Sequence, residues 1–374
     1  MLPVGIWRIK TYPSKSPHDS PNDPVPVIQI LVPLKGISNK SREILQTLLV
    51  QNYTNYRIMF ILENDLDPAF ELVMEFCSRH KHVELLLTGA ANQCGQKNFG
   101  LAKAVASLDS EVEILVFCDS TNAASPDWLG KISRPVRSGD FEVCTTFRSF
   151  LPETLNVPGI CQALYASTVF ALLAVTPKPW GGATVIRKRT FDRLNVSNVW
   201  MHTVVDDLTL GNILNAAKVK IFVSPENFLS SPIGKQTLKG LLAFLDRQIL
   251  FPKFTNPGIW IFTVLWHISL CSSLLLSSVG LISYFVGILG SGYAWIGALF
   301  WIGILALLAS LRTLNQAKIP IIKWMITFPV LVFIATYVCV RSIFLDHIDW
   351  HGKRYYCGKG GVVIAIEDPR IEAN

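Results

Sequence analysis

Charged residues are missing from two long stretches of this chain of 374 residues, of which only 16% are Asp, Glu, Lys or Arg. No charge lies between Lys253 and Arg312, and none lies between Lys323 and Arg341. A membrane span needs roughly 20 apolar residues, whereas a soluble core helix does not need so long an uncharged run. Residues 256–344 are therefore expected to form a transmembrane region. About three hydrophobic segments are expected in it, at 258–286, 293–311 and 320–344.

Cysteine pairs at metal-ligand spacing are also absent. The eight cysteines are scattered without a C-x-x-C motif, which argues against a zinc site and against a disulfide framework. The chain lacks a soluble stretch in which aromatic residues alternate with Lys and Arg, so nucleic acid is not an expected partner. The net charge is +7, and many cations flank the apolar segments, which indicates contact with anionic lipid headgroups.

A secretory signal peptide is not visible either. Residues 1–25 are polar and rich in proline after a short apolar start, and we expect them to form a flexible leader. The region before residue 253 is therefore expected to stay in the cytosol, as part of a multi-pass membrane protein. Three crossings would place the polar tail, 345–374, outside, although its basic residues favour the inside. A re-entrant segment within 257–311 would restore an inside tail.

Strand-like and helix-like segments alternate from residue 26 to about residue 225. Strands are expected at 27–32, 57–62, 83–87 and 113–118, and helices at 41–51, 68–80 and 97–107. This alternation predicts an α/β domain whose mainly parallel sheet is covered on both faces. Ligands of such sheets bind beyond the carboxyl ends of the strands, so polar residues at strand ends are the first candidates for function.

Two further segments bear on the organisation of the chain. Residues 159–176 are apolar and uncharged but short for a span, and they fit an interfacial helix and a buried helix equally well. The tail holds a short strand candidate at 362–366, after a glycine-rich stretch. No internal repeat is present.

Acidic residues stand at three strand–helix junctions: Glu63-Asn64-Asp65, Asp119-Ser120, and Asp206-Asp207 before an expected helix at 207–216. Each alone could merely cap a helix. Together they match the needs of sugar transfer from a nucleotide sugar. A metal held by a carboxylate neutralises the leaving diphosphate, one carboxylate binds base and ribose, and another takes the proton of the attacking hydroxyl. Asp206 could raise the basicity of Asp207, since like charges resist joint ionisation.

These residues resemble motifs of the family 2-type glycosyltransferases with the GT-A fold, and the chain is most similar to ceramide glucosyltransferases and their bacterial relatives. The resemblance covers roughly 26–255. It rests on Val32-Pro33-Leu34-Lys35-Gly36, Asp67-Pro68-Ala69, Cys118-Asp119-Ser120 with Ser125-Pro126-Asp127, and Asp206-Asp207. It implies a GT-A catalytic domain with a Rossmann-like mixed α/β sheet over 26–255, followed by the C-terminal helical transmembrane region.

The resemblance also implies roles for individual residues. Asp119 approaches a Mg²⁺ or Mn²⁺ ion and the diphosphate, and Asp207, with Asp206 beside it, is the catalytic base. The nucleotide-sugar site is implied to include Pro33, Lys35, Glu63, Asn64, Asp65, Lys97, Asp119, Ser120, Arg247 and Gln248. Trp180, Gly181 and Gly182 are implied to lie on the acceptor side, where small residues let a substrate approach the backbone.

Two positions depart from the family pattern. Asn64 stands where the family usually has Asp, so Glu63 or Asp65 could share the contact to uracil. The fourth motif, normally Gln or Arg and two residues later Arg-Trp, is matched by the run Arg247-Gln248-Ile249-Leu250-Phe251. The second arginine, which normally contacts the pyrophosphate, is therefore absent, and Arg247 or Lys253 is the expected substitute.

The sequence thus predicts an inverting, metal-assisted transferase that moves a hexose from a UDP-sugar to a lipid hydroxyl, with Asp207 as base. Its partners would be the UDP-sugar, a ceramide-like or other lipid acceptor, and the bilayer, and the acceptor would enter along 159–176 and the first span. A polysaccharide synthase should have more spans and an intact fourth motif, whereas a polyprenyl-phosphate sugar transferase differs only in its acceptor. A membrane scaffold with a degenerate nucleotide-binding domain is the non-enzymatic alternative, against which Asp119 and Asp207 speak.

The location of the protein is expected from the same features. The tail run Trp350 to Tyr356 resembles a motif of bacterial relatives, which favours a bacterial inner membrane. The catalytic domain is expected on the cytosolic face of that membrane. Neither the sugar nor the lipid is specified by the sequence.

Overall fold

The computed structural model describes residues 1–11, 25–225 and 229–368, and it divides into two compact units. One, here called the sheet unit, comprises Ile9–Arg148, Thr176–Pro232 and Asp346–Asn374. The other, here called the helical unit, comprises Met1–Arg8, Ser149–Val175 and Ile233–Leu345. The units interleave along the chain, so the tail that follows the long apolar helices belongs to the sheet unit.

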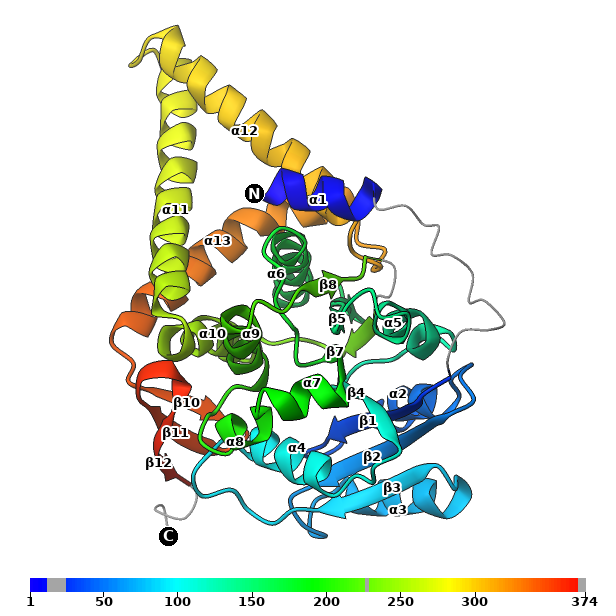
Figure 1. Ribbon diagram of the computed structural model, residues 1–374. Helices are drawn as coiled ribbons and strands as arrows, with labels where there is room; N and C mark the ends of the chain where they lie inside the picture. Colours follow the sequence, from blue (N-terminus) through cyan, green and yellow to red (C-terminus); the bar gives the residue numbers. More distant parts are fainter. Residues whose placement is uncertain (12–24, 226–228, 369–374) are drawn as a thin grey trace. The chain divides into compact units, whose positions relative to one another are not determined.

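The sheet unit is built on a seven-stranded sheet with the order β3-β2-β1-β4-β7-β5-β8 (Figure 1). The strands are β1 (Val27–Pro33), β2 (Tyr56–Leu62), β3 (Val83–Leu87), β4 (Val112–Cys118), β5 (Val143–Thr145), β7 (Ala183–Arg187) and β8 (Ile221–Val223). β1 to β4 run parallel to one another, whereas β7 runs antiparallel to β4 and β5. The chain leaves β1 for β2 and β3, then returns to place β4 on the other side of β1. Such a switch point between β1 and β4 is where α/β sheets bind ligands.

Alternating side chains of the strands form one apolar core on each face of the sheet. Ile28 and Ile30 pack on one face beneath α2, α3 and α5, whereas Leu31 and Phe117 pack on the other beneath α4, α7, α8 and α9. The bounds are α2 (Ser41–Leu49), α3 (Phe70–Arg79), α4 (Gln96–Ala106), α5 (Trp128–Arg137), α7 (Lys188–Arg193), α8 (Val196–Trp200) and α9 (Asp206–Ala216). Strands covered on both faces are apolar throughout, which is why they could be predicted from the sequence. The expected mixed α/β sheet is confirmed.

The tail forms a small antiparallel sheet of its own within the sheet unit. Its strands are β10 (His347–Trp350), β11 (Lys353–Cys357) and β12 (Val363–Glu367), with a short 3-10 turn, η1 (Lys359–Gly361), before β12. The backbone N–H of Val363 donates to the His202 carbonyl at 2.9 Å, and that of Val204 donates to the Gly361 carbonyl at 3.1 Å. The tail is thereby bonded to the segment that leads directly into α9. The strand expected near 362–366 is confirmed as β12.

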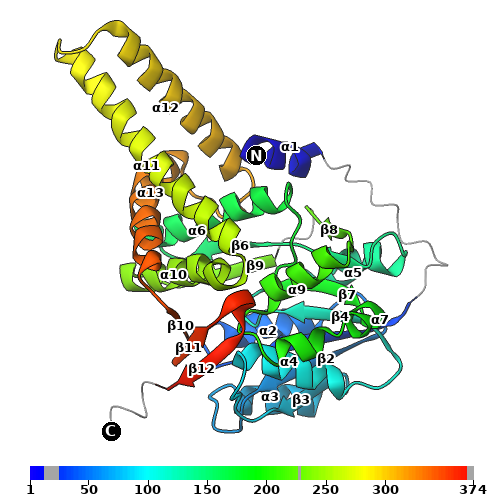
Figure 2. The same cartoon turned by 60° about the vertical axis from the view of Figure 1, so that its left-hand side comes forward.

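Three helices of the helical unit are long and apolar enough to cross a membrane. They are α11 (Pro257–Phe285), α12 (Ser291–Arg312) and α13 (Ile321–Ile343), and their mean hydropathies of 1.9, 2.2 and 1.9 confirm the three predicted segments. α11 and α12 lie side by side as an antiparallel hairpin (Figure 2). A Cβ on Gly297 would lie only 2.7 Å from the Ser277 carbonyl oxygen, so this glycine permits the close approach of the two helices.

The apolar segment expected at 159–176 is a buried helix, α6 (Val157–Leu173). It packs against α12, α13 and α10 (Leu238–Thr255), all in the helical unit. Its polar residues are satisfied inside this packing, since the Asn315 side-chain amide lies 3.4 Å from the Ser167 hydroxyl. The buried-helix alternative is therefore correct. The remaining strands are β6 (Arg148–Pro152) and β9 (Leu229–Ile233).

The expected flexible leader is wrong for its first part, because residues Leu2–Thr11 form a helix, α1. Ile6 is buried, and a Cβ on Gly5 would lie only 1.8 Å from the carbonyl oxygen of Ala171 in α6. Arg8 also donates to the Ala174 carbonyl at 3.2 Å, next to the end of α6. The short apolar start of the sequence thus forms a packed helix. Residues 12–24 of the expected leader lie outside the described residues.

Candidate active site

Lys97 joins two of the predicted carboxylates at the carboxyl edge of the sheet. Its Nζ lies 2.9 Å from Asp119 Oδ1 and 3.0 Å from Asp206 Oδ2, and it donates to the Gly181 carbonyl at 3.2 Å. Burial lowers the pKa of Lys97, but the charges of Asp119 and Asp206 outweigh burial and hold it above its usual value. Lys97 is therefore a permanent cation, and it ties the end of β4 to the start of α9.

Asp207 is partly buried beside this network and has a different electrostatic environment. Burial, and next the charge of Asp206, raise the pKa of Asp207 to about 7. The backbone N–H of Gly181 donates to its Oδ2 at 3.1 Å, and that of Leu208 donates to Oδ1 at 2.7 Å. The expected effect of Asp206 on Asp207 is confirmed, although burial is the larger cause. A carboxyl with a pKa near neutrality, held in a fixed orientation, suits a base that works at physiological pH.

Local structure explains how these groups are positioned. Asn98, fully buried on α4, donates to both the carbonyl and the hydroxyl oxygens of Thr203, at 2.9 and 3.1 Å. This fixes the loop that precedes Asp206. On the other side, the Asn122 side chain donates to the Gly182 carbonyl at 3.0 Å and so fixes the loop that follows Asp119. Both side-chain amides hold the loops beside the carboxylates in place, although they carry no charge.

The structure explains the glycines at positions 181 and 182 by local packing, and not by access for the acceptor. A Cβ on Gly181 would lie 2.2 Å from Asp206 Oδ2 and 2.9 Å from Lys97 Nζ. A Cβ on Gly182 would lie within 2.2 Å of the Trp180 ring. The first glycine thus makes room for the buried ion pair, and the second makes room for the indole.

Arg148 was not singled out by the sequence, yet its guanidinium lies next to Asp119. Its Nη1 is 4.0 Å from Asp119 Oδ2, and its guanidinium carbon lies 5.1 Å from the centre of the Trp180 ring. Trp180 in turn packs against Phe147, with 4.8 Å between ring centres. Burial opposes the ionisation of Asp119, but the charges of Lys97 and Arg148 hold its pKa below the usual value. Arg148 has no motif around it, and no strand was predicted at this position, so the local sequence carried no signal for it.

A second charged cluster surrounds Glu63, which directly follows β2. Lys35 Nζ lies 3.3 Å from Glu63 Oε2, and Lys353 Nζ from the tail lies 3.8 Å from Glu63 Oε1. Lys353 also donates to the side-chain oxygen of Gln96 at 3.4 Å. Glu63 therefore lies between two lysines that are far apart in the sequence.

The other predicted residues near this edge have simpler surroundings. Pro33 ends β1, and Ser120 follows Asp119 at the end of β4. Asn64 and Asp65 are exposed, and the Asn64 side chain accepts a bond from the Leu66 N–H at 3.1 Å. Asp67, in the first acidic motif, accepts bonds from the Gly36 and Ala69 N–H groups, so it links the end of β1 to the start of α3.

Comparison with known proteins identifies the family of this chain. Residues 2–363 match the family described as Glycosyl transferase family 21. The chain belongs to this family. It is therefore a glycosyltransferase, and the expected resemblance to family 2-type, ceramide-glucosyltransferase-like enzymes is confirmed. Among curated proteins, no sequence matches significantly.

One solved structure supports the fold of this family 21 glycosyltransferase. The mannosyltransferase PcManGT from Pyrobaculum calidifontis, solved with GDP-Man and Mn²⁺, is 12% identical and has a TM-score of 0.50. The match covers 92% of this chain and 94% of that chain, and it shows the GT-A fold. A 4-diphosphocytidyl-2C-methyl-D-erythritol synthase from Anaerococcus prevotii DSM 20548 is 11% identical, with a TM-score of 0.38, over 59% of this chain and 97% of that chain.

The fourth-motif residues of the glycosyltransferase lie in the helical unit, on α10. Arg247 and Gln248 are thus carried by a different unit from Asp119 and Asp207. Lys253 was an expected substitute for the missing arginine, but its amine is bound elsewhere. Its Nζ donates to the carbonyls of Ser342, Ile343 and Leu345, at 2.7, 3.2 and 2.5 Å. Lys253 therefore caps the C-terminal end of α13, where a cation is favoured by the free carbonyls.

Asp119 is the carboxylate that this edge offers to a metal ion. Within the described ranges of the chain, no group of three or more His, Cys, Asp or Glu side chains could hold one. Asp119 offers one carboxylate at the end of β4, with 27% of its side chain exposed. A single carboxylate fits Mg²⁺ or Mn²⁺, since such ions often take their other ligands from substrate phosphates and water.

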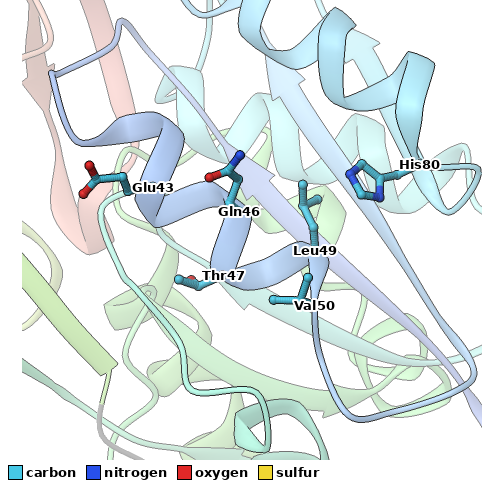
Figure 3. Close-up of a pocket in the computed structure, with 6 residues that line it drawn as sticks. All are labelled: Glu43, Gln46, Thr47, Leu49, Val50 and His80. Carbon is cyan, nitrogen blue, oxygen red and sulfur yellow. The ribbon is translucent and has the colours of Figure 1, made fainter.

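A surface depression elsewhere on the sheet unit lacks any of these groups. It is lined by Glu43, Gln46, Thr47, Leu49, Val50 and His80, which lie along α2 and just after α3 (Figure 3). None of the predicted site residues contributes to it. The depression is therefore separate from the sheet edge that carries Asp119 and Asp207.

Proposed function

We propose that the protein is an inverting transferase that moves a hexose from a UDP-sugar to a lipid hydroxyl at the membrane surface. The observation that carries this proposal is Asp207, a partly buried carboxyl with a pKa of about 7 beside the Lys97 network. A base of this pKa removes the acceptor proton at neutral pH without a large energetic penalty. Attack of that hydroxyl on the anomeric carbon, with departure of the diphosphate from the opposite face, inverts the configuration.

The diphosphate end of the donor is assigned to Asp119, Lys97 and Arg148. Asp119 would hold Mg²⁺ or Mn²⁺, which when bound supplies positive charge to the leaving diphosphate. Arg148 is proposed to take the role of the arginine that the fourth motif lacks. Its guanidinium stacks on Trp180 and is close to Asp119, so it is oriented before the donor binds.

A lipid acceptor is supported by two structural parts that the chain combines. A glycosyltransferase sheet and three membrane-length helices occur in one polypeptide. Membranes that contain the protein, given radiolabelled UDP-glucose or UDP-galactose and Mg²⁺, should yield a labelled product soluble in chloroform. A labelled water-soluble polymer would instead support a polysaccharide synthase. A lipid product that mild acid hydrolyses would indicate a glycosyl phosphate, and thus a polyprenyl-phosphate acceptor.

The pH dependence of transfer should follow Asp207. Because the base must be ionised and its pKa is raised to about 7, kcat/KM should fall about tenfold for each pH unit below that value. In Asp206→Asn, the neighbouring negative charge is removed, so the pKa of Asp207 should fall. The decrease of kcat/KM on the acid side of the profile, here called the acid limb, should therefore move to lower pH. A pH–rate profile of both proteins from pH 5 to 9 measures the shift. An unchanged limb in Asp206→Asn would contradict the assignment of Asp207.

The membrane topology is inferred from the tail. Its sheet is hydrogen-bonded to residues 202–204 of the sheet unit, so tail and catalytic sheet are inferred to share one side of the membrane, taken as the cytosolic side. The chain must then cross the bilayer an even number of times between residues 256 and 346. The α11–α12 hairpin meets this need. α13 carries Pro329, and 39% of its most apolar stretch is buried, against 11% in α11, so it is assigned to packing rather than to a third complete crossing.

Epitope tags in sealed vesicles can check this topology. A tag after Asn374 and a tag in the exposed turn 138–140 should be cleaved by added protease from the same side. A tag in the α11–α12 turn, at 286–290, should be protected in those vesicles. A tail tag protected together with the 286–290 tag would mean an odd number of crossings and would contradict the inference.

A further inference from the structure

The tail hairpin brings a lysine to the edge of the sheet that carries the site. Lys353 is 257 residues away from Gln96 in the sequence, yet its amine reaches Gln96 and Glu63. Only 10% of its side chain is exposed. Burying a lysine is costly unless a partner compensates its charge, and Glu63, at 3.8 Å, is that partner.

The turn of the hairpin fixes the register that aims Lys353 inward. Trp350 pairs with Lys353, which leaves His351 and Gly352 as a two-residue loop. Both loop residues have positive φ, +51° and +81°, as a type I′ turn requires. Because a slip of one residue would turn Lys353 to the opposite face of the hairpin, this turn sets which side chain meets Glu63.

The hairpin is held in place on the catalytic sheet at several points. Tyr355, two residues after Lys353, is 2% exposed, and the backbone N–H of Gln96 bonds to its hydroxyl. The charge of His351 is among those that lower the pKa of Asp119. The hairpin is therefore fixed beside Gln96 and Glu63, with His351 close enough to Asp119 to lower its pKa.

The balance of charge at Glu63 favours an anionic ligand. Lys35 and Lys353 each approach a different oxygen of one carboxylate, so the cluster has two cations for one anion. The remaining positive charge lies in a partly buried place, where an electrostatic attraction is stronger than in water. A nucleoside diphosphate has the opposite charge.

We propose that Lys353 is a positioning residue of the nucleotide-sugar site, which with Lys35 orients Glu63 toward the nucleotide and adds positive charge for a nucleoside diphosphate. This inference rests on the proposed function, because it needs the donor at this edge. By this proposal, the tail hairpin contributes directly to the binding of the sugar donor. A purely structural ion pair would stabilise the fold without changing nucleotide affinity selectively.

Binding of UDP to the full-length protein, measured by titration calorimetry with Mg²⁺, tests the proposal separately from transfer. In Lys353→Met the Kd for UDP should rise about tenfold, and the donor KM should rise with it while kcat changes less than about threefold. Lys353→Arg should restore most of the affinity. Lys359→Met, an exposed lysine of the same tail, is the matched control and should leave both values unchanged. Unchanged UDP affinity in a folded Lys353→Met protein, or an equal loss in Lys359→Met, would overturn the proposal.

A measurement on the unaltered protein covers the case in which Lys353→Met does not fold. UDP with Mg²⁺ should slow the acetylation of Lys353 by sulfo-N-hydroxysuccinimide acetate, followed by mass spectrometry, while Lys359 reacts at an unchanged rate. Equal rates at Lys353 with and without UDP would overturn the proposal. If UDP protects Lys353 but no UDP-sugar is used as donor, the nucleotide site stands and the proposed transfer fails.

Discussion

Replacing Asp207 with asparagine should lower kcat for sugar transfer by about 10²- to 10⁴-fold, the usual contribution of a general base. The amide keeps the size of the side chain and its place beside the Gly181 N–H, but it cannot accept the proton of the acceptor hydroxyl. UDP affinity should change by less than about twofold, because Asp207 is assigned no contact with the nucleotide. Initial rates of lipid labelling and a UDP titration measure the two effects.

Two controls separate this effect from a loss of structure. Asp192→Asn, at an exposed aspartate of α7, should keep normal activity. Because burial raises the folded-state pKa of Asp207, ionised Asp207 destabilises the fold increasingly as pH rises from about 4 to about 7. Asp207→Asn removes that penalty, so at pH 8 its melting temperature should equal or exceed that of the unaltered protein. Near-normal transfer by Asp207→Asn would mean that another group is the base.

Arg148→Met should weaken UDP binding by about 30-fold or more, which corresponds to about 2 kcal/mol for the loss of a partly buried charge contact to the diphosphate. Donor KM should rise in parallel. Arg148→Lys keeps the charge but loses the planar group that stacks on Trp180, so it should give an intermediate affinity. Titration with UDP and Mg²⁺ measures all three proteins.

Two further variants test whether Arg148, or Arg247 as expected from the sequence, contacts the diphosphate. Arg189→Met, at a guanidinium that is 74% exposed, should leave UDP affinity unchanged. Arg247→Met tests the fourth-motif residue on α10. Normal UDP affinity in Arg148→Met combined with a large loss in Arg247→Met would return the diphosphate contact to the fourth motif.

Local sequence patterns were sufficient for β1 to β4 and for the acidic residues at the sheet edge, whereas β5, β7 and β8 were not predicted. The apolar runs of β1, β2 and β4 predicted the buried strands, because both faces of the sheet are covered. Asp119 could be found because it follows a buried strand and matches a family motif. Asp206-Asp207 could be found because they begin a predicted helix and match another motif, although the structure places helix α8 and a loop before them, and not the expected strand. Lys97 could be found only by resemblance, since nothing in its neighbours indicates that it joins two carboxylates.

The residues that local patterns missed depend on long-range contacts. Arg148 reaches Asp119 across the sheet edge, and Lys353 reaches Glu63 from a tail that follows three apolar helices. Lys253 was predicted as a phosphate ligand because it follows the fourth motif, but its amine donates to a carbonyl at the C-terminal end of α13. Likewise, the apolar runs predicted three hydrophobic segments without specifying how many of them cross the membrane.

The central claim is tested most directly with the purified protein in ceramide-containing vesicles, given UDP-[¹⁴C]glucose and, separately, UDP-[¹⁴C]galactose, with Mg²⁺. The anomeric configuration of the isolated lipid product is then read by NMR. We expect a labelled glycolipid from one of these α-linked donors, with a β linkage, and its loss in Asp207→Asn. An α-linked product, or the same amount of labelled lipid from Asp207→Asn, would contradict it.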